Sequence, residues 1–226
     1  MTHNVDLRPT KAPNLPIASY EYAPYYQDQL NNVLRLYFAQ LDNFSSAITG
    51  SDGGAYIQNP HIAASDTTNQ YATGNDIPTK VKWNTLDTGS GFTLNVDNTA
   101  TAHHRGVYKI DYSLQFANTD NAQNNVFVWL EVTNGGTTQV TNSSSDFTLV
   151  ARKSVGVSSY LVAYSSITFE IHAGDIISLW WATSTAYNPV GPVNGIFMEA
   201  LPAQTTPYAR PANPSAVGVI IFVSTT

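Results

Sequence analysis

The spacing of hydrophobic residues changes from a helical to a strand-like pattern close to residue 60. Before that point, apolar side chains recur at intervals alternating between four and three residues, which is the spacing of one helical stripe. Pro24 suits the first turn of such a helix, and the run from Thr49 to Gly54 is a strong stop signal. The pattern therefore predicts one helix over residues 24–50, with a stripe made of Leu30, Leu34, Tyr37, Leu41, Phe44 and Ile48.

The predicted helix is short, so it needs packing partners to persist. Its stripe is consistent with a seam between copies of the chain, or with a helix lying on the protein's own β core. Val33, Leu36 and Phe38 broaden the apolar surface beyond the seam of a two-chain coil. We favour a trimer seam, or a helix wedged among neighbouring proteins, and expect the six stripe residues to serve oligomerisation or anchoring.

Residues 1–23 carry Pro9, Pro13 and Pro16 and predict an extended arm. We expect this arm to be docked on a partner and to act as an anchor. Residues 51–60 are expected to be a linker. The domain organisation predicted is therefore an arm over 1–23, a helix over 24–50, a linker over 51–60 and a head over 61–226.

Alternating apolar and polar positions dominate the rest of the chain and predict strands. Between Gly106 and Phe116, every second residue is large and apolar. The segment Asp175–Ala182 is apolar on both faces, which is typical of a sandwich strand that also packs against a partner. The predicted strands are Lys80–Leu86, Phe92–Val96, Gly106–Phe116, Asn125–Val132, Tyr160–Ile171, Asp175–Ala182, Gly195–Leu201 and Ala216–Ser224.

This number of strands predicts a mainly β head, built as a β-sandwich or jelly roll. The last strand, GVIIFVS, is too apolar for a free tail and should lie centrally in a sheet. The stretch Pro202–Pro214 holds four prolines and is expected to be a long connection on the outside of the head.

The composition of the chain argues against several classes of function. Charged residues are 12% of the chain, against ~25% in typical globular domains, and the net charge is −6. The chain has no run of Lys or Arg, which argues against a nucleic-acid partner. It has no cysteine and no apolar stretch that would serve as a signal peptide or membrane span. We expect no membrane partner and no export by the general secretory route.

Residues that could carry chemistry are few. No GxSxG, Walker, GxGxxG or HExxH motif is present. His103 and His104 are adjacent and are interpreted as a solvated turn rather than a metal site. The run Asn118–Asn121 has oxygen ligands but too few carboxylates for a calcium loop. Asp111 and Asp146 would need to be paired in space for glycosidase chemistry. We expect no enzyme activity, catalytic residue, metal or cofactor.

Three stretches resemble the trimeric jelly rolls of the C1q/tumour-necrosis-factor family. They are GVYKIDYSL at 106–114, AGDIISLWW at 173–181 and GVIIFVS at 218–224. In that family a Gly-x-Tyr strand lies mid-domain, and a Gly-Asp turn starts a later strand. The resemblance implies a jelly-roll head and a homotrimer.

A second resemblance covers most of residues 14–226. Residues 14–44, 116–130 and 200–224 resemble virion structural proteins of tailed phages, especially phages of cyanobacteria and marine bacteria. Those proteins commonly join a similar N-terminal segment to a C1q-like head. The resemblance implies a trimer located in the virion and anchored through its N-terminal region.

Three functions follow as hypotheses. The first is a capsid decoration or cement protein, with the major capsid protein or other virion proteins as partners. The alternative is a short fibre or tail protein that recognises a host surface glycan or protein through head loops, for which we expect Thr133–Asn142 and Ala186–Asn194 at one end of the head. A wall-degrading enzyme ranks last, because no motif supports it.

Overall fold

The computed structural model describes residues 13–15, 21, 24–49, 59–134, 136–139, 142–188 and 194–225. The chain divides into two compact units, Met1–Gln58 and Asn59–Thr226. The second unit is called the head below. Most of the arm predicted over residues 1–23, and most of the predicted linker, lie outside the described residues.

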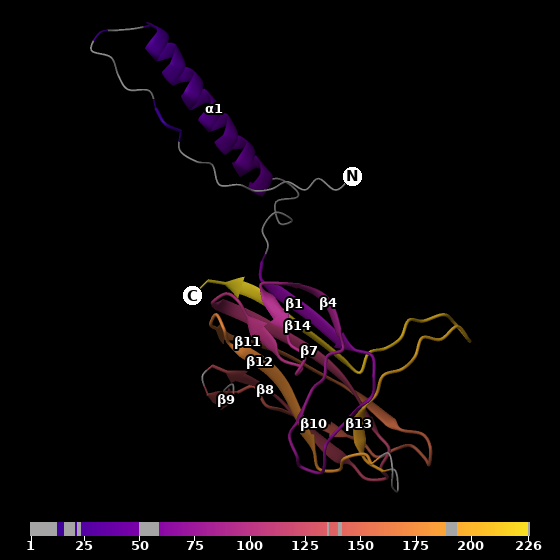
Figure 1. Ribbon diagram of the computed structural model, residues 1–226. Helices are drawn as coiled ribbons and strands as arrows, with labels where there is room; N and C mark the ends of the chain where they lie inside the picture. Colours follow the sequence, from indigo (N-terminus) through magenta and orange to yellow (C-terminus); the bar gives the residue numbers. More distant parts are fainter. Residues whose placement is uncertain are drawn as a thin grey trace. The chain divides into compact units, whose positions relative to one another are not determined.

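The described residues of the N-terminal unit form the helix α1 (Pro24–Thr49), as the stripe predicted (Figure 1). Proline at its first position removes only a backbone N–H that would have no helical partner. The helix begins without an acidic first turn and ends without a basic last turn, so its dipole is not offset by charge there. Among the described residues, no helix combines the length and the hydropathy needed to cross a bilayer.

The head is a sandwich of two antiparallel sheets, each with seven strands. Sheet A follows the order β2-β13-β7-β14-β1-β4, and β11 pairs with the other edge of β7. Its strands are β1 (His61–Asp66), β2 (Gln70–Tyr71), β4 (Thr85–Ser90), β7 (Gly106–Asn118), β11 (Ser159–Ile171), β13 (Ile196–Met198) and β14 (Ala216–Ser224).

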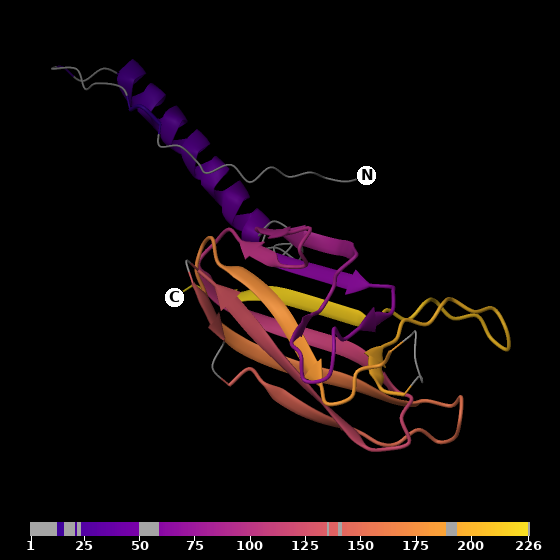
Figure 2. The same ribbon diagram turned by 60° about the horizontal axis from the view of Figure 1, so that its bottom comes forward.

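Sheet B follows the order β10-β8-β12-β6-β5, with β3 paired to β12 and β9 to β8. Its strands are β3 (Thr79–Lys80), β5 (Phe92–Leu94), β6 (Ala100–Ala102), β8 (Asn124–Thr133), β9 (Thr137–Gln139), β10 (Ser145–Leu149) and β12 (Ile176–Thr183). The chain crosses repeatedly from one sheet to the other, which is the arrangement of a jelly roll (Figure 2). The predicted mainly β jelly-roll class is therefore confirmed.

The core lies between the two sheets and follows from strict alternation. In β7, Tyr108, Ile110, Tyr112, Leu114 and Phe116 are all buried, whereas the residues between them are half-buried. Sheet B contributes its own row of inward-facing side chains to the core. The Phe116 ring lies 5.4 Å from the ring of Trp181 on β12. Burying such large side chains contributes about 1.5–3 kcal/mol each, so this interior carries much of the stability of the head.

Some of the strand predictions were wrong. The predicted strand Lys80–Leu86 is divided, because β3 joins sheet B and β4 joins sheet A. The intervening chain crosses between the sheets and buries Val81 on the way. Five strands were missed: β1, β2, β6, β9 and β10. Three of them have only two or three residues, and HIAASD of β1 and SDFTL of β10 are short and rich in small or polar residues. The final strand is central, as expected, with β7 on one side and β1 on the other.

The loops expected at one end of the head lie at opposite ends. At the entry end, where Asn59 and Pro60 precede β1, the Asn134 amide donates to Asp175, so the loop beginning at Thr133 belongs there. At the far end, the backbone N–H of Ala186 donates to Asn75 Oδ1, so the loop beginning at Ala186 belongs there. The antiparallel course of β8, which runs from the far end to the entry end, separates the two loops.

Replacing Leu114 by alanine tests the assignment of the inward row. The side chain is fully buried, so the change should lower the free energy of unfolding by about 2–5 kcal/mol. Urea unfolding followed by tryptophan fluorescence reports on the head, because all four tryptophans lie between residues 83 and 181. Leu86→Ala is the matched control, since Leu86 is exposed. Equal losses for both variants would contradict the assignment.

Candidate interaction surface

The outer face of sheet A carries an apolar row where a solvent-facing strand would carry polar side chains. On β11, Leu161 and Ala163 point to the core, and the alternate residues point outward. Three of those outward residues are large and exposed: Tyr160 (57%), Val162 (58%) and Tyr164 (58%). β11 therefore presents a hydrophobic ridge on the side of sheet A that faces away from sheet B.

Strand register extends this ridge across the sheet. Val162 pairs with Gln115 and Tyr164 with Ser113 on β7, and Ser113 in turn pairs with Val217 on β14. Farther along β14, Val219 and Ile221 take the same outward orientation. We call this surface the outer face of sheet A, defined by Tyr160, Val162, Tyr164, Val217, Val219 and Ile221.

Charge within the outer face is compensated locally. Lys109 Nζ lies 2.9 Å from Asp111 Oδ2, and the Tyr164 hydroxyl donates to Asp111 Oδ1 over 3.4 Å. Burial raises the pKa of Asp111, but the bonds from Lys109 and Ser166 outweigh it and leave that pKa below its usual value. The bond to Asp111 likewise raises the pKa of Lys109. The charges of Lys109 and Asp111 on the outer face are therefore paired with each other.

An aromatic cluster adjoins the outer face at the far end. Phe197 and Tyr160 flank Ala117 on opposite sides, so they share one face of the sheet. The Phe197 ring lies 5.6 Å from Tyr71 and 4.8 Å from Tyr187. Burial and the nearby Glu199 carboxylate raise the pKa of Tyr160 and keep it neutral. This edge is therefore aromatic and uncharged apart from Glu199.

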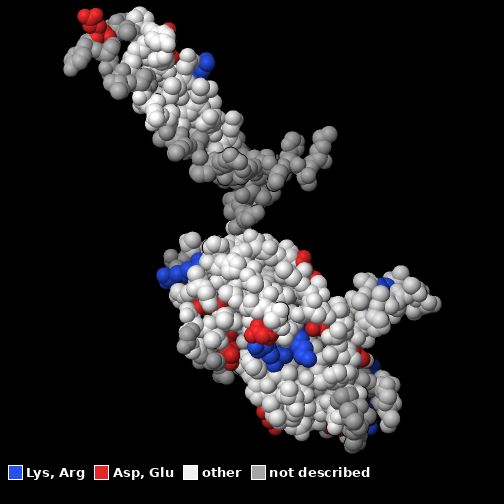
Figure 3. Space-filling view, viewed as in Figure 1, with Lys and Arg blue, Asp and Glu red and all other residues white. Residues whose placement is uncertain are grey.

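Figure 3 shows a head surface that is mostly free of charged side chains on the face in view, with a small mixed group of acidic and basic residues. The exposed Tyr160, Val162 and Tyr164 form an apolar ridge on β11, and exposed apolar patches mark sites of association in soluble proteins. Desolvating tyrosine and valine costs little, and tyrosine is enriched where proteins meet. The outer face of sheet A is therefore suited to bind a protein surface.

Sequence reasoning missed Tyr160, Val162 and Tyr164 as site residues. The segment SYLVAYSSITFEI did carry a signal for an outward apolar surface. Residues 160–164 are all apolar, so both faces of the strand are apolar there. Their placement required the partner strand, since only the pairing with β7 shows which set faces the core.

The predicted anchor residues occupy one stripe of α1. Leu30, Leu34, Tyr37, Leu41 and Phe44 are all half-buried, and none of the five is fully covered. The side chain of Ile48 lies outside the described residues. Leu36 and Phe38, beside the stripe, are exposed. Their part in oligomerisation or anchoring stays a prediction.

The residues considered for chemistry do not assemble into a site. Asp111 lies on the outer face of sheet A, whereas Asp146 lies on the exposed side of β10 in sheet B, so the pairing needed for glycosidase chemistry is absent. His103 lies in an exposed loop, where its Nε2 is 2.9 Å from Thr93 Oγ1. The Asn118 side chain is used internally, because its amide donates to the carbonyls of Ala122 and Val150.

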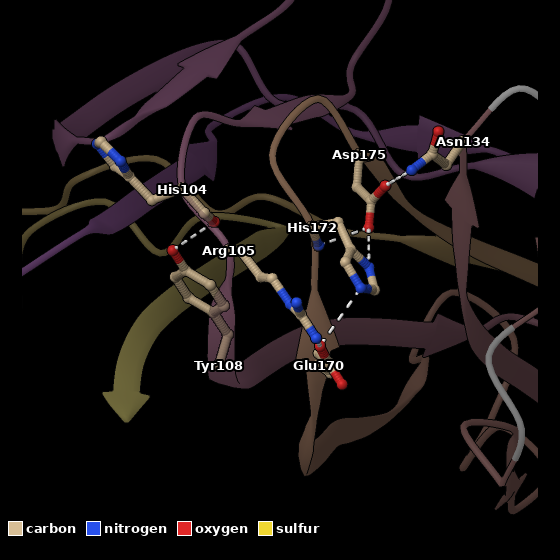
Figure 4. Close-up of polar contacts among 7 residues, drawn as sticks. All are labelled: His104, Arg105, Tyr108, Asn134, Glu170, His172 and Asp175. Atoms are coloured by element: carbon tan, nitrogen blue, oxygen red, sulfur yellow. Dashed lines mark hydrogen bonds and ion pairs between the residues drawn. The ribbon is translucent and has the colours of Figure 1, made fainter. Parts of the chain in front are cut away.

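One polar cluster lies at the entry end (Figure 4). Arg105 Nη2 lies 2.6 Å from Glu170 Oε1, and His172 lies between Glu170 at 3.3 Å and Asp175 at 3.6 Å. The Asp175 carboxylate accepts the His172 backbone N–H at 2.8 Å and the amide of Asn134. The cluster therefore ties the β11–β12 turn to the end of β8. Within the described ranges, no three His, Asp or Glu side chains are placed to hold a metal.

No protein-family model matches the chain, and no characterised protein matches it in sequence. Among solved structures, the fold is similar to the Eiger TNF from S. frugiperda, at 15% identity and a TM-score of 0.45 over 74% of this chain and 95% of that one. It is also similar to the globular domain of zebrafish complement 1qA protein, at 12% identity and a TM-score of 0.44 over 74% and 99%. Both are similarities of fold.

Replacing Asp111 by asparagine tests the paired charge on the outer face. The pKa of Asp111 is lowered in the folded head, so its contribution exists above the unfolded value of about 3.9 and disappears as pH falls through the folded value. We expect Asp111→Asn to lower stability at pH 7 by a few tenths to about 1 kcal/mol, and the difference from the wild type to shrink below pH 4.

Urea unfolding at pH 7 and pH 3 measures this difference. Asp146→Asn is the matched control, because Asp146 is exposed and accepts a bond from the Asn125 amide instead of a lysine. A difference between the wild type and Asp111→Asn that grows as the pH falls would contradict the role given to Lys109.

Proposed function

We propose that this chain is a non-enzymatic, homotrimeric structural protein of a tailed-phage particle, where it decorates the capsid and anchors through its N-terminal unit. The observation that carries the proposal is the tyrosine- and valine-lined outer face of sheet A, in which the charges of Lys109 and Asp111 are paired with each other. No cofactor or metal is needed for this function, which consists of binding and of stabilising contacts between subunits.

Self-association through sheet A explains the composition of that face. A trimer buries each copy's ridge against a neighbouring copy. Tyr160, Val162 and Tyr164 are then removed from water, and no unpaired charge is buried with them. Obligate interfaces of this kind bury more than ~2,000 Å² and are more hydrophobic than transient ones. The compensated Lys109–Asp111 pair is compatible with burial, since both partners remain hydrogen-bonded.

The helix α1 supports three copies rather than two. A two-stranded seam needs one narrow stripe, but α1 carries further apolar residues on its flank, with Leu36 and Phe38 exposed. In a trimer each helix contacts two neighbours, so a broad apolar surface is used more fully. The half-buried stripe around Leu34 and Leu41 would form the centre of that bundle.

The virion location rests on the resemblance of residues 14–44, 116–130 and 200–224 to tailed-phage structural proteins. A decoration protein spans junctions between capsid subunits, so that internal pressure must break additional contacts. The arm and α1 would supply those contacts to the major capsid protein, and the head would close the trimer.

A pocket at the far end favours a second candidate function, a short fibre or tail protein that recognises the host surface. The pocket has a volume of about 370 Å³ and is lined by Thr119, Arg152, Tyr187 and the loop residues 155–158. Arg152 Nη1 donates to the Thr119 carbonyl and to Asn194 Oδ1, both over 3.1 Å. A fixed guanidinium beside a tyrosine suits one residue of a glycan.

Val162→Asp tests self-association through sheet A. A carboxylate at the centre of the ridge would be buried without a partner, so the trimer should dissociate to monomers at micromolar concentration. Sedimentation velocity measures the species. Val155→Asp is the matched control, because Val155 is 85% exposed in a far-end loop outside the ridge. An unchanged sedimentation coefficient for Val162→Asp would contradict the assigned interface.

Leu34→Asp and Leu41→Asp test the helix separately. Each puts a charge into the apolar stripe, and we expect loss of trimer stability or of incorporation into particles. Incorporation is measured by quantitative mass spectrometry of purified particles, where a decoration protein is present in hundreds of copies. A few copies of the wild-type chain per particle would favour the fibre or tail function instead.

A further inference from the structure

The segment 200–214 interrupts what would otherwise be one continuous strand. β13 and β14 run in the same direction along the same edge of β7, with Met198 opposite Phe116 and Ala216 opposite Leu114. Only Gln115 lies between those partners on β7. Its carbonyl accepts the Glu199 N–H at 2.9 Å, and its N–H donates to the Ser215 carbonyl at 2.8 Å. Residues 199–215 therefore take the place of a single residue in the sheet.

The inserted segment forms a hairpin that projects from the head, rather than the outer wrapping expected from its prolines. Figures 1 and 2 both show it, in gold, extending away from the sandwich. Its two limbs are joined by reciprocal backbone bonds between Leu201 and Asn213 at 2.9 Å, and between Gln204 and Arg210 at 2.9 and 3.1 Å. Four prolines restrict it further. The hairpin is thus held in an extended shape that projects from the head, and at its base the Ala200 N–H donates to Asn69 Oδ1 over 2.9 Å.

The exposure of the hairpin shows that the head does not need it for its core. The residues around the tip are exposed, and Tyr208 is 65% exposed. Ordering such a segment costs conformational entropy, which no burial within the described part of the chain offsets. A binding partner would offset it, and the stiffness of the hairpin would limit the further cost of docking.

The chemistry of the hairpin matches the outer face of sheet A on another copy. Proline-rich segments bind surfaces lined with aromatic rings, because the stiff, apolar proline rings pack on aromatic faces. The outer face and its neighbouring aromatic cluster supply Tyr160, Tyr164, Tyr71 and Tyr187. The hairpin starts opposite Gln115, which pairs with Val162 on that same face, so the two features lie on adjoining parts of the head.

We propose that the 200–214 hairpin of one copy clasps the tyrosine-lined β11 side of a neighbouring copy. This inference rests on the proposed self-association through sheet A and adds a second contact to it. Within one trimer each copy would then give a hairpin to one neighbour and receive one from the other. Arg210, the single charged residue of the segment 200–214, would remain at the rim of the contact.

Photo-crosslinking tests the partner directly. The full chain carrying Tyr208→benzoylphenylalanine is prepared in unlabelled and ¹⁵N-labelled forms, the two are mixed, refolded together and irradiated. We expect mixed-label crosslinks whose second peptide comes from residues 159–171 or 66–79. Crosslinks confined to one chain, mixed-label crosslinks only to other parts of the head, or no crosslinks would each overturn the proposal. Val155→benzoylphenylalanine is the control, because Val155 is also exposed but lies on a different far-end loop.

A deletion measures the contribution of the clasp. Removing residues 200–214 joins Glu199 to Ser215, whose bonds to Gln115 would then form a two-against-one β-bulge. We expect this variant to remain trimeric, but to exchange subunits at least ten times faster than the wild type in native mass spectrometry. Tyr208→Ser, which leaves the backbone intact, should accelerate exchange by a smaller factor, and Val155→Ser should not.

The outcomes separate the clasp from the trimer itself. A trimeric deletion variant with unchanged exchange, together with unchanged exchange for Tyr208→Ser, would overturn the clasp and leave the proposed function standing. A wild-type chain that is monomeric would overturn both.

Discussion

The pairing of β7 on both of its edges is the constraint on which the rest of the head depends. One edge binds β11 over thirteen consecutive residue pairs, and the other binds β14 and then β13. The pairing is regular along β11 and between Ala216 and Phe222 of β14, so the alternation of β7 is transmitted to these residues without a change of face. The same register that sends Leu114 and Phe116 into the core sends Val162 and Tyr164 outward. The strand register of β7 therefore determines both which residues form the core and which form the interaction surface.

Alternation made much of this architecture predictable. The segment 106–116 shows period two so clearly that its core residues could be named from the sequence, and the apolar GVIIFVS could be placed centrally. The helix could be bounded at both ends because Pro24 and the glycine-rich stop signal are strong local features. These cases share a local cause: each pattern reports a backbone geometry that the residues themselves prefer.

The features that escaped prediction depend on partners distant in sequence. HIAASD has few large apolar residues, yet it forms β1 because β14 and β4 provide hydrogen bonds on both sides. The ridge on β11 could not be assigned to a face without β7. The projecting hairpin looked like a connection, because the sequence does not show that β13 and β14 are collinear. The stripe on α1 was correctly located on a helix, and its part in oligomerisation or anchoring stays a prediction.

The central claim for the function of this chain is that its copies associate through the outer face of sheet A. Sedimentation equilibrium of the wild-type chain at low micromolar concentration tests that claim most directly, because the mass it yields does not depend on molecular shape. The account predicts a single species of three times the 24.5 kDa chain mass. A species of one chain mass, with the apolar ridge left in water, would contradict it.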